Sequence, residues 1–362
     1  MSPALLVRRA FVVAGLLLTF FAFLWALPRN ADLAPRASAA HAAPRRSDVQ
    51  LFVRTVDDVR KGQAYYEAAG DEMRAGGYPT QSVFNWRQPL VYLALSSVPL
   101  LLAQIWLAAL AVKLLWDTGK TVPRETLAVL PMVNSCIGLL VPVAVYLTEA
   151  WAGLCIGLSL LAYARNRERA GAMWGLTALF VRELAAPYCL LAGSLALWRR
   201  RWDEVRVWAA GAVCYAVYYG LHAVQVLRHV RPDDGAHLKS WVAFGGLPFL
   251  AETLRANGLL LLAPRFVVAI VAVALVAAWW NARLPLHARA TLVMYGGLFL
   301  VVGLPFNGYW GLLIAPTVSL WLAHSWGGLC ALWDPAPFLP SSAAPGQGAS
   351  VRAATAPVAS RV

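Results

Sequence analysis

The sequence predicts an all-α, polytopic transmembrane helix bundle with about ten spans and juxtamembrane helices in its first external loop. Of the 362 residues, 60% are hydrophobic and only 14% are charged, which is more apolar surface than a soluble domain can bury. Several apolar runs reach the roughly 20 residues that are needed to cross a hydrocarbon core. The chain also has 16 tryptophans, many of them at the ends of these runs, where an amphipathic ring prefers the headgroup level.

The net charge of +13 is concentrated in short loops between apolar runs. The basic clusters lie at residues 8–9, 120–124, 165–169, 199–202 and 281–289. Short cationic loops stay in the cytoplasm, so the clusters indicate topology, and both termini are predicted on the cytoplasmic side of the inner membrane. No basic stretch is interleaved with aromatics as a nucleic-acid groove requires, and no nucleic-acid partner is expected.

The five cysteines all fall inside apolar runs, and none belongs to a CxxC pair. A disulfide framework or a zinc site is therefore not expected. Small buried thiols of this kind serve as packing residues.

The basic clusters predict the order of the first spans. Residues 10–27 cross outward, residues 28–88 form a long external loop, and residues 89–116 return. Residues 126–163 lie between two cationic loops that should share a side, so we expect a hairpin there. Residues 171–198 meet the same condition and predict a second hairpin that breaks near residues 182–188.

The rest of the chain is divided by the same rule. One span is expected at 205–228, a second external segment at 229–258, and further spans at 259–280, 288–304 and 309–333. The transmembrane domain then covers residues 1–333. Residues 334–362 are rich in Ala, Pro, Ser and Gly without periodicity, which predicts a disordered tail.

The first external loop contains a helical pattern. Apolar side chains recur at three- and four-residue spacing from Val49 to Val59, which predicts a helix that lies on the membrane plane with its apolar side down. Gly62 interrupts this pattern. The stretch "AYYEAAGDEMRAGG" then predicts a second short helix that two glycines end.

This loop, directly after a first span, resembles the first loop of the GT-C superfamily of integral-membrane glycosyltransferases. The likeness rests on "SDVQLF…GQAYYEAAGDEMRAGGYP", on the later hairpin "GAMWGLTALFVRELAAPYCLLAGSLALWRRR" and on "NGYWGLLIAPTVSLWLAH" near the end. The resemblance implies a polyprenyl-phosphate-linked sugar as donor, a glycan, lipid or protein acceptor in the cell envelope, and contact with membrane lipids. A divalent metal is possible for such an enzyme, but the sequence has no Asp-x-Asp or other metal motif.

The implied chemistry needs few groups. When an acceptor hydroxyl attacks the sugar C1, a base takes its proton, while the phosphate leaves as an anion and needs no general acid. One carboxylate and cations that hold phosphate are sufficient. In the superfamily the base is an acid of the first external loop, and Asp48 matches that position. Asp48 follows Ser47 at a helix start, so a helix-capping role is the alternative.

The candidate substrate-binding residues are Arg182, Arg87, Glu183, Tyr65, Tyr66 and Glu149. Arg182 and Glu183 lie at membrane depth, where ionisable groups are costly and functional or mutually paired. Arg182 and Arg87 could bind the lipid phosphate, although Arg87 could instead extend toward the membrane surface. Glu149 could be the counter-ion of Arg182 or simply exposed. Tyr65 and Tyr66 could stack on sugar rings or anchor the loop at the interface.

Two other functions fit the composition. A transporter or flippase would have ionisable groups along several spans and internal pseudo-symmetry. A non-catalytic membrane scaffold would tolerate both Asp48→Asn and Arg182→Ala. The enzyme interpretation predicts instead that Asp48, Arg182 and a further external cation line one outward-opening cavity with an apolar groove for the lipid tail.

Overall fold

The computed structural model describes residues 3–27, 47–122, 128–235, 242 and 244–333. The predicted tail at 334–362 and residues 28–46 of the predicted external loop lie outside these residues. The first half of the chain forms α1 (Pro3–Ala26), α2 (Asp48–Arg60), α3 (Tyr65–Ala75), η2 (Val83–Asn85), α4 (Pro89–Ser97), α5 (Leu100–Thr121), α6 (Val129–Ile137), η4 (Gly138–Leu140), η5 (Pro142–Tyr146), α7 (Thr148–Ala164) and α8 (Glu168–Val181). The second half forms η6 (Glu183–Ala185), α9 (Ala186–Trp198), α10 (Trp202–His229), α11 (Gly246–Arg255), η7 (Gly258–Leu261), α12 (Arg265–Ala278), α13 (Leu286–Val301), η8 (Pro305–Ile314) and α14 (Ala315–Trp333).

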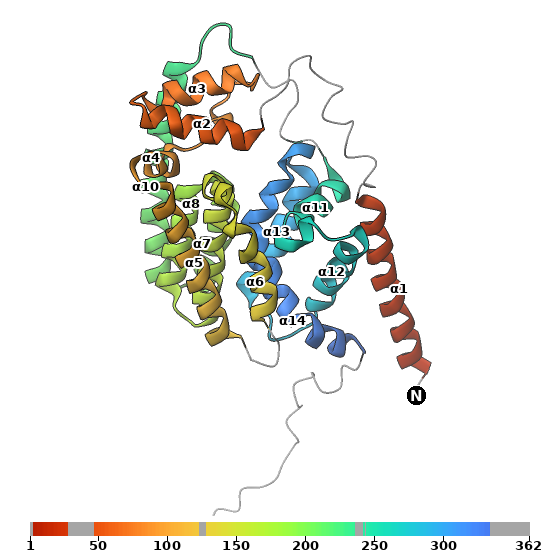
Figure 1. Ribbon diagram of the computed structural model, residues 1–362. Coiled ribbons are helices and arrows are strands. Elements are labelled where there is room, and N and C mark those ends of the chain that lie inside the picture. Colours follow the sequence, from red (N-terminus) through yellow and green to blue (C-terminus); the bar gives the residue numbers. More distant parts are fainter. Residues whose placement is uncertain (1–2, 28–46, 123–127, 236–241, 243, 334–362) are drawn as a thin grey trace, which may run out of the picture.

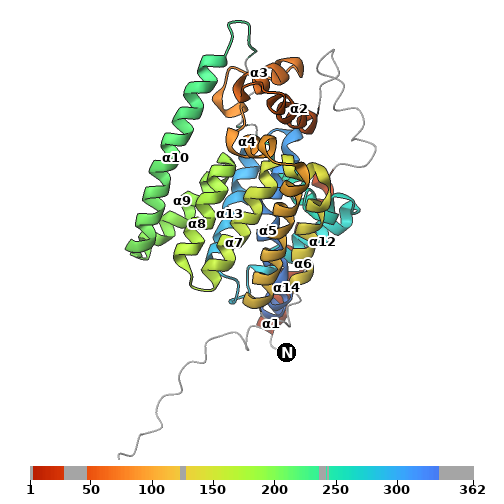
Figure 2. The ribbon, with the colours of Figure 1, turned by 60° about the vertical axis from the view of Figure 1, so that its left-hand side comes forward.

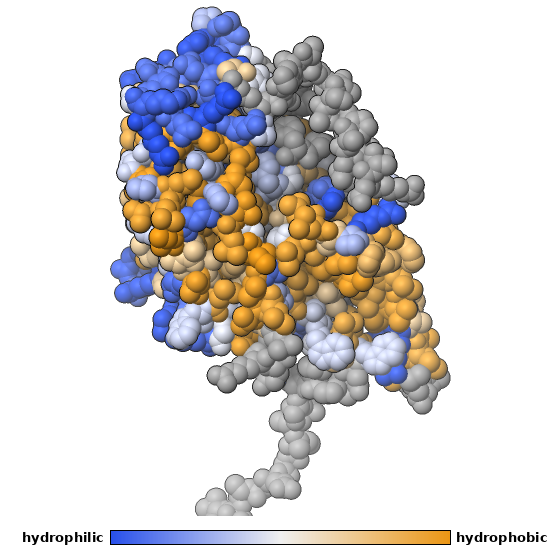
Figure 3. Space-filling view, in the orientation of Figure 1, coloured by the Kyte–Doolittle hydropathy of each residue, from blue (hydrophilic) through white to orange (hydrophobic). Residues whose placement is uncertain are grey.

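The all-helical class is confirmed for the described residues. Four helices are long and apolar enough to cross a membrane, at Leu5–Ala26, Leu100–Thr121, Trp202–His229 and Asn307–Trp333, and five shorter apolar helices accompany them. The count of about ten spans stays a prediction. Apolar side chains cover the middle of the molecule, and the region of α2 and α3 forms a hydrophilic cap above them (Figures 1 and 3).

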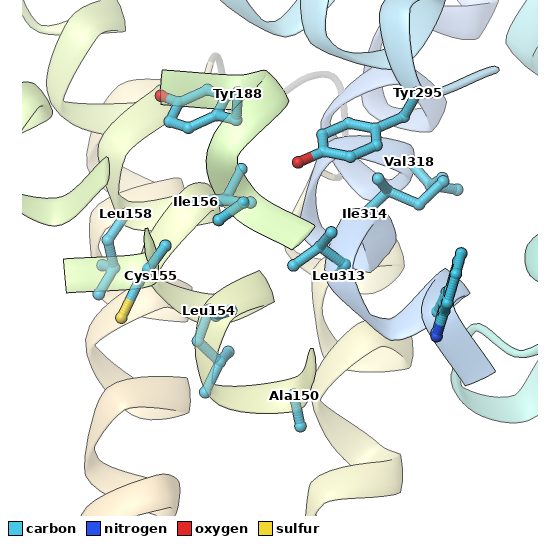
Figure 4. Close-up of a cluster of buried hydrophobic side chains, with 14 of the residues drawn as sticks. Ala150, Leu154, Cys155, Ile156, Leu158, Tyr188, Tyr295, Leu313, Ile314 and Val318 are labelled. Atoms are coloured by element: carbon cyan, nitrogen blue, oxygen red, sulfur yellow. The ribbon is translucent and has the colours of Figure 1, made fainter. Parts of the chain in front are cut away.

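Helix α7 forms the centre of the bundle. Nearly all of its side chains are buried, and it packs against α5, α8, η8 and α14. Figure 4 shows part of this core, where Leu154 and Ile156 of α7 lie near Leu313 of η8. Gly153 permits the close contact with η8, because a Cβ atom there would overlap the carbonyl oxygen of Leu312. This contact places η8 beside the start of α7.

The two predicted hairpins are present. Helix α8 ends at Val181, Arg182 is extended with φ −153° and ψ 122°, and α9 begins at Ala186. The basic loops on either side of this hairpin lie at one end of the bundle, since Arg201 pairs with Glu168 at 3.1 Å. The loop after α7 lies beside the end of α5, where Arg165 contacts Asp117 at 3.0 Å.

The start of α1 and the end of α14 also lie together. The Arg8 guanidinium donates to the carbonyl of Ala331 at 3.5 Å, and the Arg9 guanidinium lies 4.5 Å from the centre of the Trp333 ring. The two ends of the described bundle therefore share one side of the molecule (Figure 1). Which side faces the cytoplasm stays a prediction.

The second span differs from the prediction. Residues 89–116 do not form one helix, because the chain is extended at Val98 and at Pro99, between α4 and α5. Proline disfavours helical backbone in the residue before it, and this explains the break.

The helices of the predicted first external loop are α2 and α3, separated at Gly62, whose φ is +101°. The apolar stripe of α2 does not form an open membrane-binding face. Phe52 is 5% exposed and Val56 is fully buried, because α2 packs against α3 and α4. The expectation of a helix with its apolar side on the lipid was wrong for these residues, since other helices of the protein cover them.

The start of the predicted second external segment lies against α3. Arg74 donates to both carboxylate oxygens of Asp234, from Nε to Oδ1 at 2.7 Å and from Nη2 to Oδ2 at 3.1 Å. The backbone N–H of Thr80 donates to the carbonyl of Gly235 at 3.1 Å. The C-terminal end of α10 therefore lies beside α3 (Figure 2).

Candidate functional site

Asp48 is the first residue of α2. Ser47 forms a capping box with Gln50, so the helix N-terminus already has a cap. The Asp48 side chain makes other contacts: Tyr78 donates its hydroxyl to Oδ1 at 2.7 Å, and Tyr309 donates to Oδ2 at 2.9 Å. Two phenols from distant parts of the chain thus hold one half-buried carboxylate in a fixed orientation.

Tyr309 connects Asp48 to Arg87. Its oxygen accepts a hydrogen bond from Nη2 of Arg87 at 2.8 Å. Nη1 of Arg87 lies 3.2 Å from Oε1 of Glu149, and this same oxygen accepts from Nε of Arg182 at 2.9 Å. Nη1 of Arg182 is hydrogen-bonded to Glu183. We call the series Asp48, Tyr309, Arg87, Glu149, Arg182 and Glu183 the polar chain.

Each member of the polar chain has a local reason for its position. Arg87 lies in the extended segment before Pro89, where Tyr65 donates its hydroxyl to the Arg87 carbonyl at 2.7 Å. Glu149 lies in the first turn of α7, where the helix dipole favours a negative charge. Arg182 and Glu183 lie in the break between α8 and α9. Arg182 is extended there and does not continue α8.

The middle of the polar chain is removed from water. The side chain of Glu149 is fully buried and that of Arg182 is 5% exposed. Buried charges are tolerated when they are paired and hydrogen-bonded. Two guanidinium groups face two glutamates in this region, so their formal charges cancel, and Asp48 adds one negative charge at the half-buried end.

Sequence reasoning named Arg182, Arg87, Glu183, Glu149 and Asp48, and the structure brings all five into the polar chain. Of the alternatives for Glu149, the counter-ion of Arg182 is the one that the geometry bears out. Arg87 does not extend to the surface, since its side chain is 14% exposed and its guanidinium lies 5.0 Å from the centre of the Phe52 ring.

Tyr65 and Tyr66 both lie against other parts of the protein, Tyr65 buried and Tyr66 half-buried. Tyr65 is buried and packs on Tyr92 with 6.1 Å between ring centres. Its hydroxyl donates to the Arg87 carbonyl. Burial raises the pKa of Tyr65 well above its usual 10, so the phenol remains a donor. The hydroxyl of Tyr66 lies 3.0 Å from Nδ1 of His222, and burial raises the pKa of Tyr66 to about 12.

Tyr309 was missed by sequence reasoning. It lies at the start of an apolar run and looked like an ordinary interfacial tyrosine. The signal that could have found it is "PFNGYW", in which a proline, an asparagine and a glycine interrupt the hydrophobic pattern and predict irregular backbone. The bond from Tyr78 to Asp48 follows the turn at Gly77, where φ is +70°.

A cavity of about 20 Å³ lies behind Arg87, between α2, α3 and α4. Its lining includes Phe52, Tyr65 and Tyr92, and this volume suits one water molecule. Asp48 and Arg182 do not line it, so it is not the outward-opening cavity that the sequence predicts.

The polar chain does not fit a divalent metal. Both oxygens of Asp48 accept from phenols, and Glu149 and Glu183 are paired with arginines. Within the described residues, no group of three His, Cys, Asp or Glu side chains is arranged to hold a metal ion.

Comparison with known proteins gives no relative: no protein-family model, curated protein or solved structure matches the chain.

Proposed function

We propose that the chain is a membrane glycosyltransferase of GT-C type. It moves a sugar from a polyprenyl-phosphate carrier to a glycan, lipid or protein acceptor of the cell envelope, at the outer face of the inner membrane. The observation that carries this proposal is the polar chain itself. It joins one oriented carboxylate, Asp48, to two guanidinium groups, Arg87 and Arg182, through Tyr309 and Glu149.

Asp48 is the proposed base. The acceptor hydroxyl transfers its proton to Asp48 while its oxygen forms a bond to the sugar C1. The bond between C1 and the phosphate oxygen breaks, and its electron pair leaves with the polyprenyl phosphate. The hydroxyls of Tyr78 and Tyr309 fix the carboxylate for this step, and its partial exposure leaves it accessible to an acceptor.

The two arginines are the proposed phosphate ligands, because guanidinium groups form strong paired hydrogen bonds with phosphate. Nη2 of Arg182 makes no hydrogen bond among the described residues, while Nε donates to Glu149 and Nη1 donates to Glu183. A bound phosphate therefore has to share the guanidinium groups with Glu149. The position of the polar chain supports a lipid-linked donor, since α2 and α3 form a hydrophilic cap over the apolar band (Figure 3).

The test uses the full-length protein in lipid nanodiscs. Radiolabelled polyprenyl-phosphate hexoses and pentoses are supplied with isolated envelope glycans, and transfer of label is measured. Asp48→Asn should lower kcat on the order of 100-fold or more, the usual contribution of a general base. The matched control is Asp57→Asn on the same helix, where the side chain is 48% exposed, and its rate should not change.

Envelope glycans from cells with the native protein, with Asp48→Asn and without the protein provide the second readout. Mass spectrometry should show the same missing sugar in the last two. Native glycans in Asp48→Asn cells would contradict the proposal, and so would movement of the carrier across vesicle membranes without any new glycosidic bond.

A further inference from the structure

An open cavity lies at the end of the bundle that carries the basic loops before α8 and α10. It has a volume of about 530 Å³, and its lining includes three arginines, Arg169, Arg200 and Arg201, together with Trp202. Helix α8 begins at this cavity, and the polar chain lies past its other end, 14 residues or about 21 Å away. Figure 2 shows the start of α10 on the same side of the bundle, away from α3. The cavity is therefore separate from the candidate site.

Two of the three acids at the cavity are in exposed or partly exposed ion pairs with its arginines. Glu168 lies 3.1 Å from Nη1 of Arg201, and Asp203 lies 3.3 Å from Nη2 of Arg169. Asp203 is also hydrogen-bonded to Arg206. Pairs of this kind contribute little, because water and salt screen them. The guanidinium groups can therefore exchange these acids for a stronger acceptor such as phosphate.

Arginines outnumber acids at this cavity. Arg200 is exposed and makes no ion pair or side-chain hydrogen bond among the described residues. The third acid, Glu204, is 2% exposed and accepts from the Tyr163 hydroxyl at 2.7 Å, so it is directed into the bundle. Residues 168–171 and 199–206 together hold five arginines and three acids. The cavity therefore has surplus positive charge.

Two helix N-termini also meet at the cavity. Helix α8 begins at Glu168 and α10 begins at Trp202, and neither N-cap residue, Arg167 or Arg201, caps its helix with its side chain. The first N–H groups of a helix carry partial positive charge, which favours a nearby anion and disfavours a nearby cation. The acids of the two first turns offset only part of the surrounding positive charge. A bound anion resolves this local conflict.

An exposed apolar surface adjoins the cavity. Leu190, Leu197 and Trp198 are seven and eight residues apart on α9, so they share one face of this helix, and each is more than half exposed. Trp202, in the lining of the cavity, is 59% exposed. Exposed tryptophan rings at the end of an apolar helix are typical of the level where lipid headgroups begin. The cations of the cavity therefore lie beside a surface that suits acyl chains.

We propose that this cavity binds the headgroup of an acidic phospholipid. The headgroup phosphate accepts paired hydrogen bonds from Arg200 and Arg169, and the acyl chains lie along the exposed face of α9. Basic pockets at the ends of membrane helices suit anionic headgroups for this reason. The inference goes beyond the proposed function, because it concerns the opposite end of α8 and needs no sugar transfer.

Other ligands match only part of this surface. A soluble phosphate compound would use the same arginines, but it would leave the exposed rings of Trp198 and Trp202 and the leucines of α9 without a partner. A phospholipid with a choline headgroup would satisfy the apolar surface, but its quaternary ammonium would lie among the arginines. An acidic phospholipid matches both the charge of the cavity and its apolar border.

The test is lipid binding by the full-length protein, measured with native mass spectrometry. Delipidated protein in detergent is titrated with phosphatidylglycerol or with phosphatidylcholine of the same acyl chains, and the affinity for the first bound lipid is compared. Phosphatidylglycerol should bind at least about 5-fold more tightly, the usual contribution of one basic residue near an anionic surface. Arg200→Gln should weaken phosphatidylglycerol binding by about 5-fold, and Arg200→Lys, which keeps the charge, should retain most of it.

A second variant and a control accompany this measurement. Addition of Arg169→Gln to Arg200→Gln should make the affinities for the two lipids nearly equal, and both side chains are exposed, so the fold should persist. The matched control is Arg228→Gln, which changes an exposed arginine near the other end of α10. It should bind phosphatidylglycerol like the native protein.

Three results would overturn the lipid site. The first is equal affinity of the native protein for phosphatidylglycerol and phosphatidylcholine. The second is an equal loss of affinity in Arg228→Gln and Arg200→Gln, which would mean that any surface arginine has the same effect. The third is displacement of phosphatidylglycerol by glycerol 3-phosphate at equal concentration, which would assign the cavity to a soluble phosphate compound.

Discussion

A single oxygen of Glu149 holds two arginines: Oε1 lies 3.2 Å from Nη1 of Arg87 and 2.9 Å from Nε of Arg182. Because Glu149 is fully buried at the start of α7, it fixes the segment before α4 to the break between α8 and α9. The distance between the two proposed phosphate ligands therefore depends on one carboxylate.

Removal of this carboxylate should destabilise the protein strongly. Glu149→Ala leaves Arg87 and Arg182 with only Glu183 as an acid, and loss of one partner of a buried pair costs about 3–5 kcal/mol. Unfolding of the solubilised protein measures the change. The control is Glu168→Ala, which removes a partly exposed pair with Arg201 and should cost at most about 1 kcal/mol. Similar losses in both variants would show that Glu149 does not organise the site.

The two phenols on Asp48 should differ in importance. Tyr78→Phe removes one hydrogen bond to the carboxylate, and a bond to a charged group is worth about 1.5–3 kcal/mol, or roughly 10- to 100-fold in kcat. Tyr309→Phe should lose more, because the Tyr309 hydroxyl also accepts from Arg87 and is the link between Arg87 and Asp48. Transfer of labelled sugar measures both. Tyr146→Phe is the control, because the Tyr146 hydroxyl makes no hydrogen bond among the described residues, and an equal loss there would refute the assignment.

Gly153 should be intolerant of any side chain. A methyl group there overlaps the carbonyl oxygen of Leu312, so α7 and η8 must move apart and Tyr309 moves with η8. We expect Gly153→Ala to cost about 1–3 kcal/mol, as overpacking in a core does, and to lower transfer activity. Gly220→Ala on α10 is the matched control, since a Cβ atom there has no neighbour within 4 Å. Unchanged activity in Gly153→Ala would mean that η8 does not position the base.

The link between α3 and Asp234 should respond to pH. The Arg74 guanidinium lowers the pKa of Asp234 from 3.8 to about 2. The pKa of Asp234 is lower in the folded protein than in the unfolded chain, so the charged carboxylate stabilises the folded state. This contribution to the free energy of unfolding is complete at pH values above 3.8 and disappears as the pH falls through about 2. At neutral pH it amounts to on the order of 2 kcal/mol.

Asp234→Asn should therefore increase amide hydrogen exchange in α3 at pH 7. The difference from the native protein should shrink between about pH 4 and pH 2. The neighbouring exposed Asp233, changed to Asn, provides the control and should exchange like the native protein. A difference for Asp234→Asn that persisted at pH 2 would exclude the charge of Asp234 as its cause.

Local patterns in the sequence predicted several elements well. The glycines at 62, 76 and 77 delimit α2 and α3, because glycine adopts the backbone angles that end a helix. The rule that short cationic loops share a side predicted the break at Arg182. Both signals are carried by residues that lie close together along the chain.

The sequence failed where the answer depended on distant packing. The stripe of α2 looked like a membrane-binding face, but α4 covers Phe52 and Val56. Tyr309 reaches Asp48 across 261 positions, and only the close contact of η8 with Gly153 shows why. The break at Pro99 was visible in the sequence and was missed because the surrounding run is mostly apolar.

The bond between Asp48 and Tyr309 has a consequence for biosynthesis. Asp48 leaves the ribosome long before Tyr309, so a nascent chain with α2 already folded still lacks the phenol that connects its carboxylate to Arg87. In the proposed mechanism, chemistry at Asp48 therefore needs the last segment of the described bundle in place. On that mechanism, a polypeptide that ends before Tyr309 is inactive and consumes no carrier.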